Sequence, residues 1–77
     1  MMAQFRRMHG VSFWREGPGE SWRCLIGVYS AKFKQTKWAN DPRRWMGLIA
    51  IDGVPMTTYG DTLWDCLRAL REAAGVR

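Results

Sequence analysis

The sequence predicts an α+β fold, with a three- to four-stranded antiparallel sheet and one C-terminal helix packed on one face of it. Short apolar segments separated by glycine-containing turns occupy residues 10–58 and indicate strands. An amphipathic segment with capping signals at both ends follows at residues 61–75 and indicates a helix. The chain has 77 residues, which suits a single domain, so we assign residues 1–77 to one.

Three strand regions support the sheet. Two strands are expected on either side of "EGPGE", where glycine and proline supply the turn. "RWMGLIAI" is apolar on both faces, which is typical of a strand inside a sheet. Asp52 and Gly53 then predict a tight hairpin into a short edge strand around residues 54–58, where Pro55 is tolerated. In the second strand, alternation gives a core face of Trp22, Cys24, Ile26 and Val28 and an opposite face of Arg23, Leu25, Gly27 and Tyr29.

The helix is expected to begin with Asp61 or Thr62 as N-cap and to stop at Gly75. Thr62 and Asp65 have the spacing of a capping box. The apolar stripe that must cover the sheet consists of Leu63, Cys66, Leu67, Leu70 and Ala74. A single helix leaves the other sheet face open, with Leu25, Tyr29 and part of the Trp14, Trp45 and Met46 set on it. An apolar patch of this kind favours partner binding or a homodimer.

The net charge of +5 favours negatively charged partners, either nucleic acid or an acidic protein surface, although solubility alone also accounts for it. The sequence shows no secretory signal and no apolar run of about 18 residues, so we expect a cytoplasmic protein without a membrane partner, in the host cytoplasm if phage-encoded. Cys24 and Cys66 both fall on core faces. Buried reduced thiols are favoured over a bridge between sheet and helix.

Residue patterns for catalysis or metal binding are missing from the sequence. His9 is the single histidine, so no zinc-ligand spacing exists. "GPG" is a turn and lacks the surroundings of a phosphate-binding loop. No serine or cysteine has an evident base and orienting group. We therefore predict a protein that is not an enzyme and that needs no cofactor.

The stretch "KFKQTKWANDPRRW" (residues 32–45) is the candidate partner-binding segment. If a strand runs past Ser30, Lys32 and Lys34 point to one side and Phe33 to the other. The segment would then form a protruding hairpin arm, with Trp38 near its tip and with the cations Lys32, Lys34, Lys37, Arg43 and Arg44. The alternative is a solvated loop whose lysines serve solubility and whose Trp38 folds back onto the core.

A second, smaller candidate group lies on the helix and consists of Trp64, Arg68 and Arg71. A guanidinium over the Trp64 indole would extend a binding surface through a cation–π contact. The favoured alternative is that Trp64 covers the margin of the core and that arginine stems shield it.

Two resemblances bear on fold and function. "IAIDGVPMTTYGDTLWDCLRALREA" (residues 49–73) resembles the strand, turn and helix of HicB-like antitoxin domains, where a glycine and "GDT" lead into the helix of a small ββα-type fold. This resemblance implies a fold only. In its size, single α+β domain and charged, aromatic surface, the chain is similar to phage-encoded inhibitors of host defence, anti-CRISPR proteins among them. That similarity implies a protein that blocks a nucleic-acid-handling complex by occupying a functional surface.

Three functions remain open from the sequence. The first is a non-catalytic inhibitor that binds a host protein or nucleoprotein complex, the second is a direct nucleic-acid-binding protein, and the third is a dimeric accessory protein. A dedicated nucleic-acid binder shows an uninterrupted basic stripe. Because Glu16, Glu20, Asp41 and Asp52 are expected to interrupt the basic surface, the inhibitor is favoured.

Overall fold

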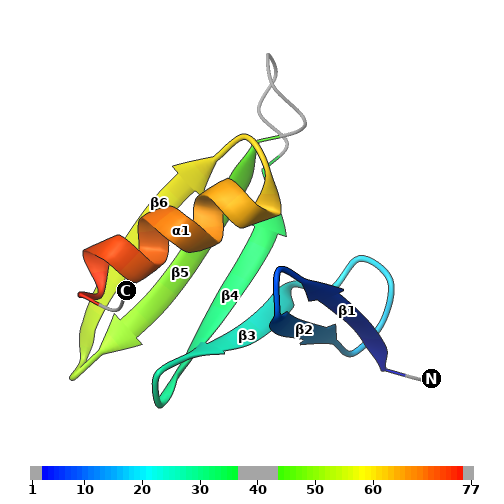
Figure 1. The fold of residues 1–77 in the computed structure, drawn as a ribbon, viewed down its shortest axis with the longest axis horizontal. Coiled ribbons are helices and arrows are strands. Elements are labelled where there is room, and N and C mark those ends of the chain that lie inside the picture. The colour runs from blue at the N-terminus through cyan, green and yellow to red at the C-terminus, as the bar shows by residue number, and fades with distance from the viewer. Residues whose placement is uncertain (1–2, 37–43, 76–77) are drawn as a thin grey trace.

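The computed structural model describes residues 3–36 and 44–75. In these residues, six antiparallel strands follow one another in chain order across one sheet, and one helix follows them (Figure 1). The elements are β1 (Gln4–Met8), β2 (Val11–Arg15), β3 (Trp22–Ile26), β4 (Tyr29–Gln35), β5 (Trp45–Ile51), β6 (Val54–Gly60) and α1 (Leu63–Ala73). The predicted α+β fold with a C-terminal helix on an antiparallel sheet is confirmed. The predicted number of three to four strands is wrong.

One of the additional strands is β1, which forms a hairpin with β2. The chain reverses at His9 and Gly10, whose φ angles are 50° and 79°. A two-residue type I′ turn requires positive φ at both positions. Asn-Gly or Asp-Gly is the usual sequence signal for this turn, so His-Gly did not indicate a hairpin, and β1 was missed.

The strand expected to run from Trp22 past Ser30 is two strands. Gly27 adopts a φ of 62° and, with Val28, reverses the chain between β3 and β4. Val28 was predicted in the core but is 86% exposed at this turn. Tyr29 pairs with Ile26 and packs against the core, so its predicted place on the open face is also wrong.

The remaining strand predictions hold. Asp52 and Gly53 have φ angles of 51° and 81°, as the expected tight hairpin demands. β5 lies between β4 and β6, and β6 is an edge strand that contains Pro55 and runs to Gly60. The sheet interior is therefore where the apolar "RWMGLIAI" pattern placed it.

The core lies between α1 and one side of the sheet, which we call the inner face. Its buried members are Phe13, Trp22, Cys24, Ile26, Ala31, Phe33, Ile49, Leu63, Cys66, Leu67 and Leu70. α1 packs across β5 and β6, and the ring of His9 stacks on Trp64 with 4.4 Å between centroids. The sheet thus curves around the helix, with β6 on one side and the β1–β2 turn on the other (Figure 1).

Two glycines allow α1 to approach the sheet closely. A Cβ atom added at Gly60 would lie 2.5 Å from the backbone nitrogen of Cys66, and one at Gly47 would lie 2.8 Å from Cys66 Sγ. The hydroxyl of Thr58 also donates to the Cys66 carbonyl oxygen at 3.2 Å. The first turn of the helix therefore rests directly on the backbone of β5 and β6.

The helix ends agree with the sequence. Thr62 is the N-cap, and its Oγ1 accepts a hydrogen bond from the Asp65 backbone N–H at 3.1 Å. Gly75, with a φ of 75°, follows the C-cap Ala74 and donates to the Glu72 carbonyl oxygen at 3.0 Å. The predicted stripe faces the sheet: its first four members are buried and Ala74 is half-buried.

Cys24 and Cys66 are both buried and both free, which confirms the predicted reduced thiols. Burial raises the pKa of the Cys24 thiol to about 11, and the nearby Arg71 guanidinium opposes part of this rise. Burial also raises the pKa of the Cys66 thiol, against a hydrogen bond with Thr58. Both thiols are therefore held in their neutral form at physiological pH.

Candidate nucleic-acid interface

The charges are segregated between the sheet and its connections. None of the six strands contains a carboxylate, whereas six of the twelve cationic residues lie in strands: Arg6, Arg7, Arg15, Arg23, Lys32 and Lys34. Glu16 and Glu20 lie in the β2–β3 loop and Asp52 lies in the β5–β6 turn. These three carboxylates therefore lie outside the strands, and Glu20 lines a pocket together with Arg6, Arg15 and Lys34. Asp41 lies outside the described residues.

The sheet face opposite α1, which we call the outer face, carries one continuous row of side chains. Register partners join all six strands along this row, which reads Phe5, Trp14, Arg23, Lys32, Leu48 and Thr57. Strands lie about 4.8 Å apart, so the row spans about 24 Å. A neighbouring row joins Lys34, Met46 and Tyr59. Arg7, with its register partner Ser12, adds a fourth cation to the face.

Two cations meet at the centre of the row. Arg23 and Lys32 are direct register partners on β3 and β4. Like charges directly opposite each other in a sheet are destabilising. The Arg23 guanidinium lies 5.1 Å from the Trp14 ring centroid, and neither cation forms an ion pair with a carboxylate of the described residues. The outer face therefore concentrates positive charge that its own side chains do not neutralise.

Large apolar side chains surround these cations. Phe5 is 79% exposed, Leu25 68%, Tyr59 51% and Leu48 41%. Trp14 is half-buried between Phe5 and Arg23 in the row. Exposed aromatic rings beside cations can stack with planar groups and bind anionic groups at the same time.

The structure describes only part of the predicted arm, residues 32–36 and 44–45. Lys32 and Lys34 lie on the outer face, and Phe33 is fully buried on the inner face, as their alternation predicted. Arg44 is exposed just before β5, and its carbonyl oxygen accepts from the Thr36 N–H at 2.8 Å and from the Thr36 hydroxyl at 3.0 Å. Lys37, Trp38 and Arg43 lie outside the residues that the structure describes.

The other predicted site residues do not reach this face. Trp64 is half-buried and stacks on His9, in line with the favoured prediction that it covers the core margin. Arg68 is exposed on α1, which packs against the inner face. In the described part of the chain, the cation–π contacts are Arg23 with Trp14 and Arg15 with Trp22, and none involves Trp64.

Sequence reasoning missed several outer-face residues, namely Phe5, Arg7, Trp14, Arg23 and Tyr59, as site members. Trp45 had been expected partly on the open face, but it packs against the core with Gly60 and Gln35 as register partners. Arg23 could have been found, because its alternation with Trp22 and Cys24 already placed it opposite the core. The other residues depend on the β1–β2 hairpin and on strand register.

The outer face offers positive charge and exposed aromatic rings. The resolved pKa shifts affect Cys24, Cys66 and Tyr29, whose hydroxyl donates to Asp52 at 3.1 Å, and these residues belong to the core or its margin. Among residues 3–36 and 44–75, no three potential metal ligands cluster. No helix in this part of the chain is long and apolar enough to cross a bilayer.

Comparison of the chain with known protein families, with curated proteins and with solved structures gave no match.

Proposed function

We propose that this protein is a non-catalytic nucleic-acid-binding protein that binds single-stranded DNA or RNA on its outer face. The central observation is the direct pairing of Arg23 with Lys32 on a sheet without carboxylates. This pairing lowers the stability of the isolated protein. An anionic partner placed across the two strands removes the repulsion, because its phosphates lie between the cations and neutralise both.

Single-stranded nucleic acid fits this face better than a duplex does. Bases that are not paired expose their π-faces, and the outer face offers the rings of Phe5, Trp14 and Tyr59. Lys32 and Lys34 lie two residues apart on the same side of β4, next to Arg23, so the cations form a short track for a backbone. Stacking together with a basic track is the recurring mode of single-strand recognition.

A second candidate is an inhibitor of the anti-CRISPR type that binds an acidic surface of a protein or nucleoprotein complex. The exposed aliphatic side chains Leu25 and Leu48 favour this second candidate. They provide apolar surface that a protein partner can bury, but they have no aromatic ring on which a base could stack. Both candidates use the same face and the same cations. They differ in whether isolated nucleic acid binds.

A binding comparison with single-residue variants tests the proposal. Fluorescently labelled 15-nucleotide single-stranded DNA and RNA, and a duplex of the same length, are titrated with protein at 50 and 200 mM salt. The variant Arg23→Gln removes one guanidinium from the centre of the outer face. Arg68→Gln is the matched control, because it removes one guanidinium from the exposed side of α1.

The proposal predicts that single strands bind more tightly than the duplex and that affinity falls at 200 mM salt. Arg23→Gln should weaken single-strand binding at least tenfold, whereas Arg68→Gln should leave it unchanged. Absence of single-strand binding at 50 mM salt would reject the nucleic-acid proposal and favour the inhibitor. Equal losses in both variants would show that net charge, and not the outer face, determines binding.

A further inference from the structure

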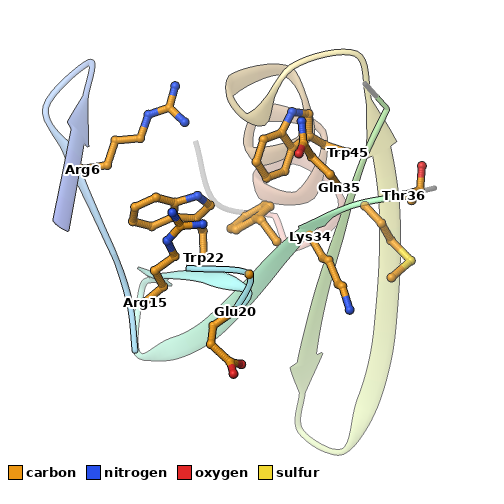
Figure 2. Close-up of a pocket in the computed structure, with 11 residues that line it drawn as sticks. Arg6, Arg15, Glu20, Trp22, Lys34, Gln35, Thr36 and Trp45 are labelled. Atoms are coloured by element: carbon orange, nitrogen blue, oxygen red, sulfur yellow. The ribbon is translucent and has the colours of Figure 1, made fainter. Parts of the chain in front are cut away.

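A cleft opens beside the β1–β2 hairpin, at the end of the sheet where β3 begins and β4 ends (Figure 2). Its volume is about 820 Å³, which lies within the usual range for small-molecule sites. Arg6 and Arg15 line it from the β1–β2 hairpin, Trp22 lines it from β3, and Gln35 and Trp45 line it from β4 and β5. Lys34 and Met46 also line the cleft, so it borders the outer face.

The cationic side of the cleft is held in place by neighbouring residues. The Arg15 guanidinium lies 4.3 Å from the Trp22 ring centroid, and its Nε donates to Gln4 Oε1 at 2.6 Å. These contacts fix the plane of the guanidinium before any ligand arrives, which lowers the entropy cost of binding. Arg6 extends from β1 into the space between the hairpin and Trp45 (Figure 2).

The opposite side of the cleft carries groups suited to a planar, polar ring. Trp45 is half-buried and offers an indole, whereas the Trp22 ring is already covered by Arg15. Gln35 is the register partner of Trp45, so its amide lies next to that indole and can both donate and accept hydrogen bonds. Glu20, from the β2–β3 loop, lines the cleft on the side of Arg15, and its carboxylate points away from Trp45 (Figure 2).

We infer that this cleft binds a nucleotide, with the base stacked on Trp45 and the phosphate held by Arg6 and Arg15. Guanidinium groups bind phosphate through paired hydrogen bonds, and two of them converge here without a carboxylate ion-pair partner in the described residues. The proposed phosphate ligands Arg6 and Arg15 are not part of the outer-face row, whereas Lys34 lines both the cleft and the outer face.

The ligand can be a free nucleotide or the phosphorylated end of a strand, and both present the same base and phosphate. The test therefore uses two arms in the full-length protein. In the first arm, AMP, CMP, UMP and inorganic phosphate are titrated while the indole N–H signals of ¹⁵N-labelled protein are followed by NMR. In the second arm, a 5′-phosphorylated and an unphosphorylated pentanucleotide are compared in the Arg23→Gln background, which weakens binding at the outer face.

The Trp45 indole signal, assigned with Trp45→Phe, should shift on addition of AMP, CMP or UMP, and inorganic phosphate should bind at least threefold more weakly than AMP. Arg6→Gln should weaken AMP binding at least tenfold, and Arg68→Gln should not change it. A preference for the phosphorylated pentanucleotide over AMP would assign the cleft to strand ends, and the reverse would assign it to free nucleotides. No Trp45 shift at millimolar AMP, or equal affinity for AMP and inorganic phosphate, would overturn the inference. Arg6 is exposed, so Arg6→Gln keeps the test valid even if a Trp45 variant fails to fold.

Discussion

Reversing the charge of Lys32 should make the protein more stable and, at the same time, unable to bind single-stranded nucleic acid. Lys32→Glu converts the like-charged pair with Arg23 into an oppositely charged pair at the same register position. Directly opposed cross-strand charges contribute about 0.2–1 kcal/mol in either direction. Replacing repulsion by attraction at an exposed position should therefore raise the free energy of unfolding by about 0.5–1 kcal/mol. For a domain of this size that change corresponds to a rise in Tm of about 2–8 °C.

Urea denaturation at 20 and 500 mM salt measures this effect. The gain should shrink at the higher salt concentration, because salt screens exposed charges. Lys32→Gln, which removes the repulsion without adding attraction, should show a smaller gain. In an Arg23→Gln background the effect of Lys32→Glu should largely disappear, as a double-mutant cycle requires for two directly interacting residues. If Lys32→Glu is neutral or destabilising at low salt, the reasoning about a repulsive pair at the centre of the outer face is wrong.

Three further predictions concern the packing of the helix and the core. Gly60→Ala should destabilise the protein by about 1–3 kcal/mol in urea denaturation, because its Cβ would clash with the backbone of Cys66. The control variant Thr57→Ala, on the outer face, should lower the free energy of unfolding by less. Equal losses of stability in the two variants would contradict the close approach of α1 to the sheet. Leu67→Ala should cost about 2–5 kcal/mol because Leu67 is 1% exposed, and a neutral result would mean that the helix does not cover the sheet. The free energy of unfolding should fall as pH rises from about 9 to about 11, by up to about 1.4 kcal/mol per pH unit from Cys24, and Cys66 should contribute in the same direction. The direction follows because burial raises the thiol pKa values in the folded protein, so that the unfolded chain loses those protons first. Cys24→Ala should reduce this slope, and an unchanged slope would show that Cys24 is not its source.

The elements with strong local signals were predictable from the sequence. Thr62 and Gly75 mark the ends of the helix by capping chemistry that acts within a few residues. The Asp52-Gly53 turn is equally local, because both residues tolerate positive φ. In each case, a short stretch contained all the interactions that define the element.

The sheet was harder to predict because two of its turns lack the Asn-Gly or Asp-Gly pair that usually indicates a hairpin. His9 adopts a positive φ without the Asn or Asp usually found there, and Gly27 interrupts what looked like one continuous strand. Missing these two reversals removed β1 and merged β3 with β4, which led to a count of three to four strands rather than six.

The candidate site was harder still, because it depends on pairing between strands. Lys32 and Lys34 were identified from local charge, but Arg23 becomes their neighbour only through the β3–β4 register. Trp14 joins the same row through its single register position with Arg23. The fold places the carboxylates of Glu16, Glu20 and Asp52 in turns and loops rather than in the strands that carry the cations.

The dependence of single-strand binding on salt concentration is the most direct test of the outer face. Each phosphate contact contributes about 0.7 to the slope of log K against log salt concentration for single strands. We predict that replacing Arg23, Lys32 and Lys34 together by Gln reduces the slope by about 2 and that Arg68→Gln leaves it unchanged. An unchanged slope in the triple variant, or the absence of binding by the wild-type protein at 50 mM salt, would contradict the proposal that this face binds nucleic acid.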